Sequence, residues 1–517
     1  MSRLDYSIKN IKYGYIASIV NALAGFVTRT IFIKTLGTDY LGVNGLYANV
    51  LGMLSFAELG IGSAMNYSLY KPVANGDKEK IKSLMYLYKK AYRFVTLIIF
   101  AIGIAIVPLI SYVIKDAGEL SHDELVTYYL IFLFNTSVSY LVSYKFSLSN
   151  AEQKNYIQTN INTVGKIIIN IAQIFVLLIW RNYFAFLLTQ SIVQLLQHVF
   201  TVYYFDKYYP LLKEKNILPL SKEEKKPIVK NIKALILHNL AGVAVYQTDN
   251  ILISSFISLS VVGIVSNYLM IIAFGTSLVS IIFNSVVSSF GNLIATESIE
   301  KQHKTFRTYR FLAFWIYGLT AILFYILLTP FVTLWIGADK TIGNSVVALL
   351  AVNYYITGQR NALLIFRNAA GAYSNDKYVA VVEAIVNLIA SIFLGKYMGL
   401  TGIYLGTIIS GLVSALMRPV IIYNDLFKIS SKEYYKDACF FIVVLLLPTI
   451  ALRTIQKYIF TKPSIATLIF LGFLVLIIVN LTIIITTRKR EEYQQIKMII
   501  EEKVFKRILP SKRKSTK

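Results

Sequence analysis

The sequence predicts an all-α polytopic membrane protein with about fourteen transmembrane helices, arranged as two six-helix lobes around a central cavity plus two extra C-terminal helices. The first observation is composition: 56% of the 517 residues are hydrophobic and 15% are charged, whereas a soluble domain carries about 25% charged residues. The second is that apolar runs of about 20 residues, each long enough to cross a ~30 Å hydrocarbon core, recur along the whole chain. The single cysteine, Cys439, excludes an internal disulfide framework and a multi-cysteine metal site.

Each apolar run between polar links is interpreted as one membrane span. In chain order the predicted spans are 13–36, 44–68, 91–114, 124–148, 158–180, 184–204, 233–257, 263–290, 311–333, 345–366, 378–398, 402–423, 438–458 and 465–487. The predicted parts are an N-terminal lobe (1–204), a cytoplasmic linker (205–232), a C-terminal lobe (233–423), two further spans (424–487) and a basic amphipathic cytoplasmic tail (488–517). The linker is lysine-rich and contains prolines, which favours a loop. The tail has apolar residues at helical spacing on a basic background, which is typical of a helix on a membrane surface.

Lys and Arg concentrate in alternate links of this pattern, and the other links contain few. The positive-inside rule then places both termini on the cytoplasmic side of a multi-pass membrane protein. The net charge of +25 is divided among short loops, and a nucleic-acid-binding protein would need one basic folded face. Anionic lipid headgroups account for the charge, so nucleic acid is not an expected partner.

The two halves of the chain contain an internal repeat. Two pairs of similar segments recur at nearly the same spacing, KNIK at 9–12 and 230–233, and NAEQKNY at 150–156 with GAYSNDKY at 371–378. Extending the first pair without a gap sets Gly42 against Gly263. A duplicated unit of six spans keeps its orientation in the membrane, so the copies are related by an axis along the membrane normal.

Ionisable side chains inside the predicted spans indicate a cavity or a buried partner, because a charge at the bilayer centre costs roughly 2.5–3.5 kcal/mol. The candidate cavity residues are Arg29, Lys34, Glu58, Lys145, Lys166 and Arg360. Their cationic excess predicts an anionic passenger, since Arg offers a phosphate bidentate hydrogen bonds and Lys adds a compact charge. One alternative is that Lys145 and Arg360 reach water at the cytoplasmic ends of their spans. Another is that Glu58 neutralises one of the cations in a structural ion pair.

Two of the spans are also rich in amide and hydroxyl side chains. They contain TNINTVGKIIINIAQ at 159–173 and TQSIVQLLQH at 189–198. Such groups bind sugar hydroxyls when they line a cavity. The alternative is that they form hydrogen bonds between helices, which are worth about 0.6 kcal/mol each in membranes.

Several short motifs carry a more specific signal. They are LG-x-x-YLG-V-NGL at 36–46, A-E-LGIG at 57–62, YKP at 70–72 and NAEQKNYI at 150–157. With these motifs the chain resembles bacterial Wzx-type polysaccharide flippases of the multidrug/oligosaccharidyl-lipid/polysaccharide exporter superfamily. The resemblance implies a V-shaped, two-lobe flippase that moves undecaprenyl-pyrophosphate-linked oligosaccharide repeat units from the cytoplasmic to the outer leaflet by alternating access. It also implies a role in capsule or O-antigen synthesis, with that lipid-linked oligosaccharide, membrane lipids and polysaccharide polymerase machinery as partners.

The resemblance also implies roles for ionisable residues. The pyrophosphate is expected to bind among the six candidate cavity residues. Transport is expected to be coupled to H⁺ or Na⁺, and no other cofactor is expected. The ion site is carried over from the lipid II flippase branch to Asp249, Glu383 and Asn387, although the residue order in the eleventh span departs from that branch. The alternative is that Asp249 pairs with His238 or packs against neighbouring amide side chains.

Three other functions compete with this interpretation. A multidrug exporter of the same superfamily would place acids in its cavity, because many drugs are cations, and the cationic excess argues against it. A lipid II flippase has the same number of spans and would be distinguished by its gene neighbourhood. A membrane enzyme of polysaccharide assembly needs an acid or base positioned by a substantial loop, whereas the four histidines are scattered. The sequence therefore predicts a transporter and no enzyme activity, and without a G-x-x-x-x-G-K-[ST] motif ATP is not its direct driver.

Overall fold

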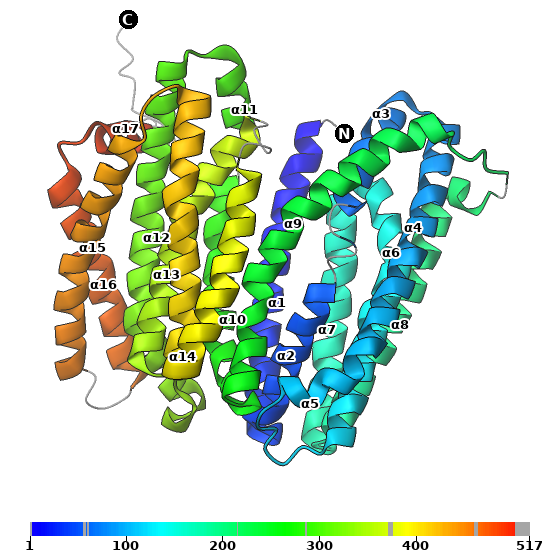
Figure 1. The fold of residues 1–517 in the computed structure, drawn as a ribbon, viewed down its shortest axis with the longest axis horizontal. Coiled ribbons are helices and arrows are strands. Elements are labelled where there is room, and N and C mark those ends of the chain that lie inside the picture. Colours follow the sequence, from blue (N-terminus) through cyan, green and yellow to red (C-terminus); the bar gives the residue numbers. More distant parts are fainter. Residues whose placement is uncertain are drawn as a thin grey trace, which may run out of the picture. The chain divides into compact units, whose positions relative to one another are not determined.

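The computed structural model describes residues 3–54, 58, 61–214, 216–284, 287–370, 376–459 and 464–501. The described chain is built from helices and their connections, which confirms the all-α prediction. It divides into two compact units, one comprising 1–266 with 395–403 and the other comprising 267–394 with 404–517. Figure 1 shows that each unit is a bundle of long helices.

The first unit contains the helices of the N-terminal half of the chain. They are α1 (Arg3–Leu36), α2 (Thr38–Leu54), α3 (Ile61–Asn75), α4 (Lys78–Ile106), α5 (Ile110–Val113), α6 (His122–Ala151), α7 (Asn155–Ile179), α8 (Tyr183–Tyr208), α9 (Lys222–Phe256) and the beginning of α10 (Leu259–Asn284). Ser121 and Ser221 begin α6 and α9 with capping boxes, in which the serine hydroxyl accepts from the backbone N–H of a glutamate three residues later. The glutamate side chain accepts from the serine N–H in return, which satisfies two unpaired donors of the first turn.

The second unit contains the rest of α10 and the helices that follow it. They are α11 (Val287–Thr296), α12 (Ile299–Ile336), α13 (Asn344–Ala369), α14 (Lys377–Ile422), α15 (Lys432–Ile459), α16 (Ile465–Thr487) and α17 (Glu491–Ile500). Gly399 interrupts α14 with φ 58° and ψ −134°, so two helices meet there. Glycine adopts this positive φ without the clash that a Cβ atom would cause.

The helices agree with the predicted multi-pass membrane protein. Within the described ranges, 10 helices are long and apolar enough to cross a membrane. The number of about fourteen spans stays a prediction, because several predicted spans do not coincide with one helix. The predicted second span at 44–68 falls on α2 and α3, the eighth at 263–290 on α10 and α11, and the eleventh and twelfth both on α14. The predicted lobe boundaries also stay a prediction, and α9, expected to begin the second lobe, belongs to the first compact unit.

Two glycines bring α2 and α10 into close contact within the first unit. A Cβ atom on Gly42 would lie 1.9 Å from the carbonyl oxygen of Leu259, and one on Gly263 would lie 2.1 Å from that of Thr38. The repeat that aligns Gly42 with Gly263 also aligns Thr38 with Leu259, so the two contacts are equivalent. A reciprocal contact of this kind is typical of two-fold symmetry, and it supports the predicted internal duplication.

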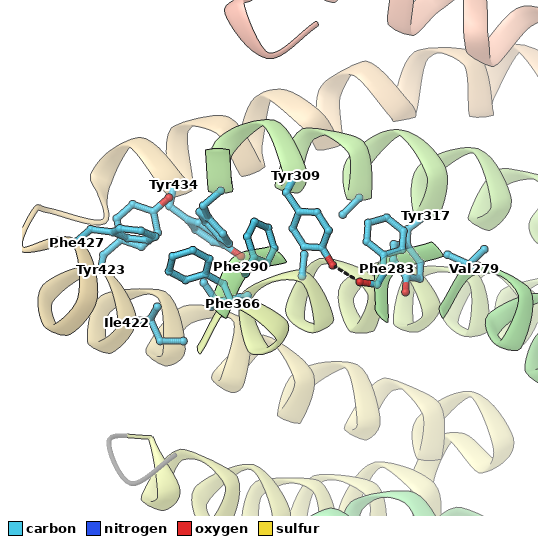
Figure 2. Packing of buried hydrophobic residues seen from close by; sticks show 14 of the residues in the cluster. Val279, Phe283, Phe290, Tyr309, Tyr317, Phe366, Ile422, Tyr423, Phe427 and Tyr434 are labelled. Carbon is cyan, nitrogen blue, oxygen red and sulfur yellow. Dashed lines mark hydrogen bonds between the residues drawn. The ribbon is translucent and has the colours of Figure 1, made fainter. Parts of the chain in front are cut away.

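An aromatic core holds the second unit together. Figure 2 shows Phe283, Tyr309, Phe290 and Phe366 packed one beside the next between the helices. The rings of Phe290 and Tyr309 meet edge to face with centroids 4.8 Å apart, a favourable geometry for aromatic pairs. The Tyr309 hydroxyl donates to the Phe283 carbonyl at 3.1 Å, so its polar atom is satisfied inside the core.

The last helices are part of this second unit. The ring of Phe441 on α15 stacks on Phe314 of α12 with centroids 4.1 Å apart. Trp315 Nε1 donates to Asn480 Oδ1 on α16 at 2.8 Å, and its ring stacks on Tyr493 of α17. The predicted helical tail is therefore present as α17, with one side packed on α12, while residues 502–517 lie outside the described residues.

Candidate functional site

The first unit contains a polar cavity of about 470 Å³ between α6, α7 and α8. Its lining residues are Ser139, Val142, Ser143, Phe146, Gln158, Asn162, Lys166, Ile169, Asn170, Gln173, Gln190, Gln194, Gln197, His198 and Thr201. The three helices are mutual neighbours, so the cavity lies inside one compact unit.

Helix periodicity explains why these residues share one space. On α7 the lining residues run from Gln158 to Gln173 at spacings of mostly three and four, so they form one face of the helix. At 1.5 Å per residue this face is about 22 Å long, which is most of a hydrocarbon core ~30 Å thick. On α8 the lining residues from Gln190 to Thr201 form a similar face. The two polar segments recognised in the sequence are therefore two walls of one cavity.

Lys166 gives the cavity a positive charge. It lies on the polar face of α7 and its side chain is exposed to the cavity. No aspartate or glutamate lines the cavity, and no described carboxylate forms an ion pair with Lys166. A lysine at hydrocarbon depth without a described counter-charge is costly in lipid, so a water-filled or anion-binding space is the environment that suits Lys166.

Other cavity groups have unused hydrogen-bonding capacity. Asn170 is only 8% exposed, and its Oδ1 accepts from Thr28 of α1 at 3.2 Å. Its Nδ2 and the Nε2 of His198 have no hydrogen-bond partner among the described residues. Buried polar atoms are normally satisfied, so these atoms fit a polar ligand such as a sugar hydroxyl or a phosphate oxygen.

Arg29 lies outside this cavity. Its guanidinium donates to the hydroxyl of Ser266 on α10, and that hydroxyl donates to the Gly263 carbonyl at 2.7 Å. The repeat sets Arg29 against Asn250, and Asn250 Nδ2 donates to the Gly45 carbonyl at 3.5 Å. Arg29 and Asn250 thus make equivalent contacts on the two sides of the glycine interface. A role for Arg29 in pyrophosphate binding stays a prediction.

The other first-lobe candidates have three different environments. Lys34 is exposed in the last turn of α1. Glu58 accepts a hydrogen bond from the Tyr92 hydroxyl at 2.9 Å, and no described Lys or Arg pairs with it. Lys145 is buried and forms an ion pair with Asp206 of α8. The Asp206 carboxylate neutralises Lys145. Of the candidate cavity residues, Lys166 is the one that lines the described polar cavity.

Arg360 and Glu383 belong to one buried ion-pair network in the second unit. Arg360 of α13 pairs with Glu383 of α14, and Arg418 Nη2 lies 3.5 Å from the same carboxylate. Arg418 Nε lies 3.0 Å from Asp376, which also pairs with Arg367. All five side chains are 8% exposed or less. Arg360 and Glu383 are therefore counter-ions of each other. The predicted binding of a pyrophosphate by Arg360 and of a cation by Glu383 stays a prediction.

Asn387, the third ion-site candidate, has a separate set of partners. Its Nδ2 lies 3.4 Å from Thr407 Oγ1 and 3.3 Å from Ser410 Oγ, both on the second half of α14. Asp249 lies on α9 in the first unit, and the side chain of His238, its expected alternative partner, lies outside the described side chains. Within the described residues, no group of three or more His, Cys, Asp or Glu is placed to hold a metal ion. The coupling site stays a prediction.

Several buried charges were missed because the helices extend beyond the predicted spans. Asp206 was placed in the linker, whereas α8 continues to Tyr208 and brings the carboxylate to Lys145. Arg367 lies just beyond the predicted span at 345–366, whereas α13 continues to Ala369. Arg418 lies within the predicted span at 402–423, on α14, but is not one of the six candidate cavity residues. One signal in the sequence could have indicated the Lys145–Asp206 pair. It is an acid within about one helical turn of the end of an apolar run, because the helix can continue that far and bring the acid to a cation in another span.

The family comparison covers more than half of the chain. Residues 7–288, which include α1 to α10, match the family described as "polysaccharide biosynthesis protein". A search of curated proteins found no match.

Solved structures with the same fold are transporters. A lipid II flippase, MurJ, in an inward closed conformation aligns with 92% of this chain and 98% of its own, with a TM-score of 0.69 and 14% identity. An inward-facing multidrug resistance MATE family transporter of the MOP superfamily covers 79% of this chain and 96% of its own, with a TM-score of 0.61 and 16% identity. The Vibrio cholerae MATE transporter VcmN covers 83% of this chain and 99% of its own, with a TM-score of 0.57 and 12% identity.

These identities are low, so the structural similarity establishes the fold alone. The family match agrees with the resemblance to Wzx-type polysaccharide flippases that the sequence motifs indicated. The chain belongs to the polysaccharide biosynthesis protein family.

Proposed function

We propose that this chain is a flippase, and that it moves a lipid-linked oligosaccharide repeat unit, carried on undecaprenyl pyrophosphate, from the cytoplasmic to the outer leaflet for capsule or O-antigen synthesis. The observation that carries the proposal is Lys166, a cation without a described counter-ion, in a cavity lined by amides and hydroxyls and free of acids. In a member of a polysaccharide biosynthesis family, such a cavity has the chemistry of a phosphorylated sugar.

The cavity lowers two separate costs of moving the headgroup. Lys166 attracts the phosphate charge, which would otherwise be unfavourable at this depth of the bilayer. The amides along α7 and α8, such as Asn170 and Gln190, replace the water that leaves the sugar hydroxyls. The polyprenyl chain stays in lipid throughout, so only the polar headgroup needs a polar path.

The same cavity argues against a multidrug exporter. Many drugs are cations, and Lys166 would repel a cation from a cavity without a described acid. A lipid II flippase would use the same chemistry as a polysaccharide flippase, and the two are separated by identifying the cargo. Both readings keep the chain a transporter.

The test is to remove the protein from its host and identify the lipid-linked sugar that accumulates on the cytoplasmic face. Accumulation of a polysaccharide repeat unit would support the proposal. Accumulation of lipid II would instead identify the chain as a lipid II flippase. In complemented cells we expect Lys166→Glu to lower polymer export at least about tenfold, because a favourable phosphate contact becomes a repulsion. Lys207→Glu is the matched control, since Lys207 is an exposed lysine at the end of α8 outside the cavity. Normal export by Lys166→Glu would overturn the phosphate-binding role.

We further propose that H⁺ or Na⁺ drives the return step through Asp249. The resemblance to the lipid II flippase branch suggests this site, and Asp249 is a carboxylate on α9 with the amides Gln247 and Asn250 beside it in the sequence. Asp249→Asn is expected to make transport insensitive to the gradient that drives the native protein. If collapsing either gradient leaves the native protein fully active, ion coupling is wrong while the cargo proposal stands.

The orientation and partners form part of the same proposal. The chain would lie in the bacterial cytoplasmic (inner) membrane with its N- and C-termini in the cytoplasm, and the concentration of Lys and Arg in alternate links supports this orientation. The repeat units delivered to the outer leaflet would then be the substrate of a polysaccharide polymerase.

A further inference from the structure

A second cavity lies directly beside the first, between the outer surfaces of α7 and α8. It is a groove of about 570 Å³ lined by Tyr156, Ile157, Asn160, Ile161, Val164, Gly165, Ile168, Val193, Leu196, Gln197, Phe200 and Tyr204. Most of these side chains are apolar, and Val164, Ile168, Leu196 and Phe200 are each at least half exposed. In a membrane-spanning segment, an exposed apolar surface of this composition faces hydrocarbon chains.

The groove and the polar cavity share Gln197. Gln197 Nε2 donates to Asn162 Oδ1 of α7 at 3.0 Å, which joins the two helices between the two spaces. Gly165 makes this possible, because a Cβ atom there would lie 1.9 Å from Gln197 Oε1. A small residue on α7 therefore lets one polar side chain separate an apolar groove from a charged cavity.

We propose that the groove holds the isoprenoid chain of the lipid carrier while its phosphate occupies the cavity at Lys166, and that the Asn162–Gln197 hydrogen bond closes the passage between them. This inference rests on the proposed function. It adds a binding site for the lipid chain and a lateral entry between α7 and α8. The bond must break for a headgroup to pass, and its two amides are then available to the sugar.

The depth of the site favours a transported lipid over a bulk phospholipid. Lys166 lies eleven residues into α7 from Asn155, which is about 16 Å along the helix. The headgroup region on each side of the bilayer is only about 5–8 Å thick. A phospholipid headgroup at the interface would therefore not reach Lys166, whereas a headgroup in transit passes this depth. Neighbouring positions 165 and 166 face the groove and the cavity respectively, so one molecule can fill both.

Photolabelling with two matched probes tests the proposal. The purified full-length protein is placed in phosphatidylcholine vesicles with a polyprenyl phosphate that carries a diazirine on its chain, or with the corresponding polyprenol. The phosphate probe is expected to label 156–168 and 193–204 about tenfold more than the polyprenol, the size of one charge-assisted contact. Equal labelling by the two probes would identify a surface for bulk lipid and would overturn the proposal.

Variants then locate the two ends of the molecule. Lys166→Gln is expected to bring the labelling ratio of the two probes close to one. Lys207→Gln is expected to leave it unchanged, because Lys207 is an exposed lysine at the end of α8 outside the groove and the cavity. Val164→Trp fills the groove and is expected to lower labelling several-fold, because a bulky ring takes the space of the chain. Leu178→Trp is its matched control, since Leu178 is an equally exposed apolar residue on α7 outside the groove. A ratio that survives Lys166→Gln would overturn the link between groove and cavity.

Export by the native protein distinguishes this inference from the proposed function. If the native chain supports polymer export but its groove shows no preference for the phosphate probe, only the groove proposal is wrong. If the native chain supports no export of any lipid-linked sugar, the proposed function itself is wrong, whatever the photolabelling shows.

Discussion

Lys166 in the first unit and the arginines Arg360, Arg367 and Arg418 in the second unit are positive side chains in contrasting environments. In the first, Lys166 lines a polar cavity without a described counter-ion. In the second, Arg360, Arg367 and Arg418 are buried against Asp376 and Glu383. A cation that forms an ion pair within the protein contributes to the stability of the fold. A cation without such a pair can bind an anionic ligand. The difference teaches that a charge in a membrane span identifies a binding site only when its partners are known.

The largest effect is expected from the second unit. Asp376 is 1% exposed and faces two arginines, so Asp376→Asn leaves an uncompensated buried charge. Breaking a buried pair in this way costs about 3–5 kcal/mol, which should appear as a large loss of thermal stability in detergent. Glu300→Gln, in the exposed first turn of α12, is the control and should change little. Similar losses in both variants would mean that the network is not a specific source of stability.

Lys166→Gln is expected to lower export while leaving thermal stability nearly unchanged, unlike Asp376→Asn. Export should fall about tenfold because a charge-assisted phosphate contact is lost. The free energy of unfolding should change by less than about 1 kcal/mol, because the side chain has no described ion pair and no core packing to lose. Thermal unfolding of the purified variant, measured beside export in cells, separates the two quantities. A large loss of stability would contradict the contrast between the two units, since Lys166 would then stabilise the fold as the arginines of the second unit do.

The Lys145–Asp206 pair tests the comparison inside the first unit. Lys145 is buried while Asp206 is partly exposed, so Asp206→Asn is expected to cost about 1–3 kcal/mol, less than a fully buried acid. The double change Lys145→Met with Asp206→Leu should recover most of the loss, because no charge is then left unpaired. Thermal unfolding measures both variants, and a double variant that is less stable than either single one would contradict the pairing.

The smallest effect is expected from an exposed pair that joins α4 and α9. The Lys80 ammonium and the Ser221 N–H lower the pKa of Glu224 from its ordinary 4.5 to about 2. Because the folded pKa is the lower one, the stabilisation is present above about pH 4.5 and is lost as the pH falls through about 2. Exposed ion pairs contribute little and are screened by salt. Glu224→Gln should therefore lower the melting temperature slightly at pH 7, and this difference should disappear at high salt.

Part of the site was predictable from the sequence. The polar segments at 159–173 and 189–198 show a helical period, and their residues form walls of the cavity around Lys166. The neutralisation of Lys145 and Arg360 was not predictable from the sequence. Their partners, Asp206 and Glu383, lie on other helices and are far away in the sequence. A span pattern gives the depth of each charge but not the direction in which it points.

The amino-acid sequence by itself determined the all-α membrane class, the family and the presence of costly charges within spans, because apolar length, composition and short motifs are local properties. The internal repeat is also local, and the reciprocal contact of Gly42 and Gly263 agrees with it. Only the tertiary structure decided which cations are neutralised and which stay open, and that an apolar groove adjoins the charged cavity at Gln197. The physical reason is that neutralisation depends on which helices are neighbours and how they are rotated, and both are set by the packing of the whole bundle.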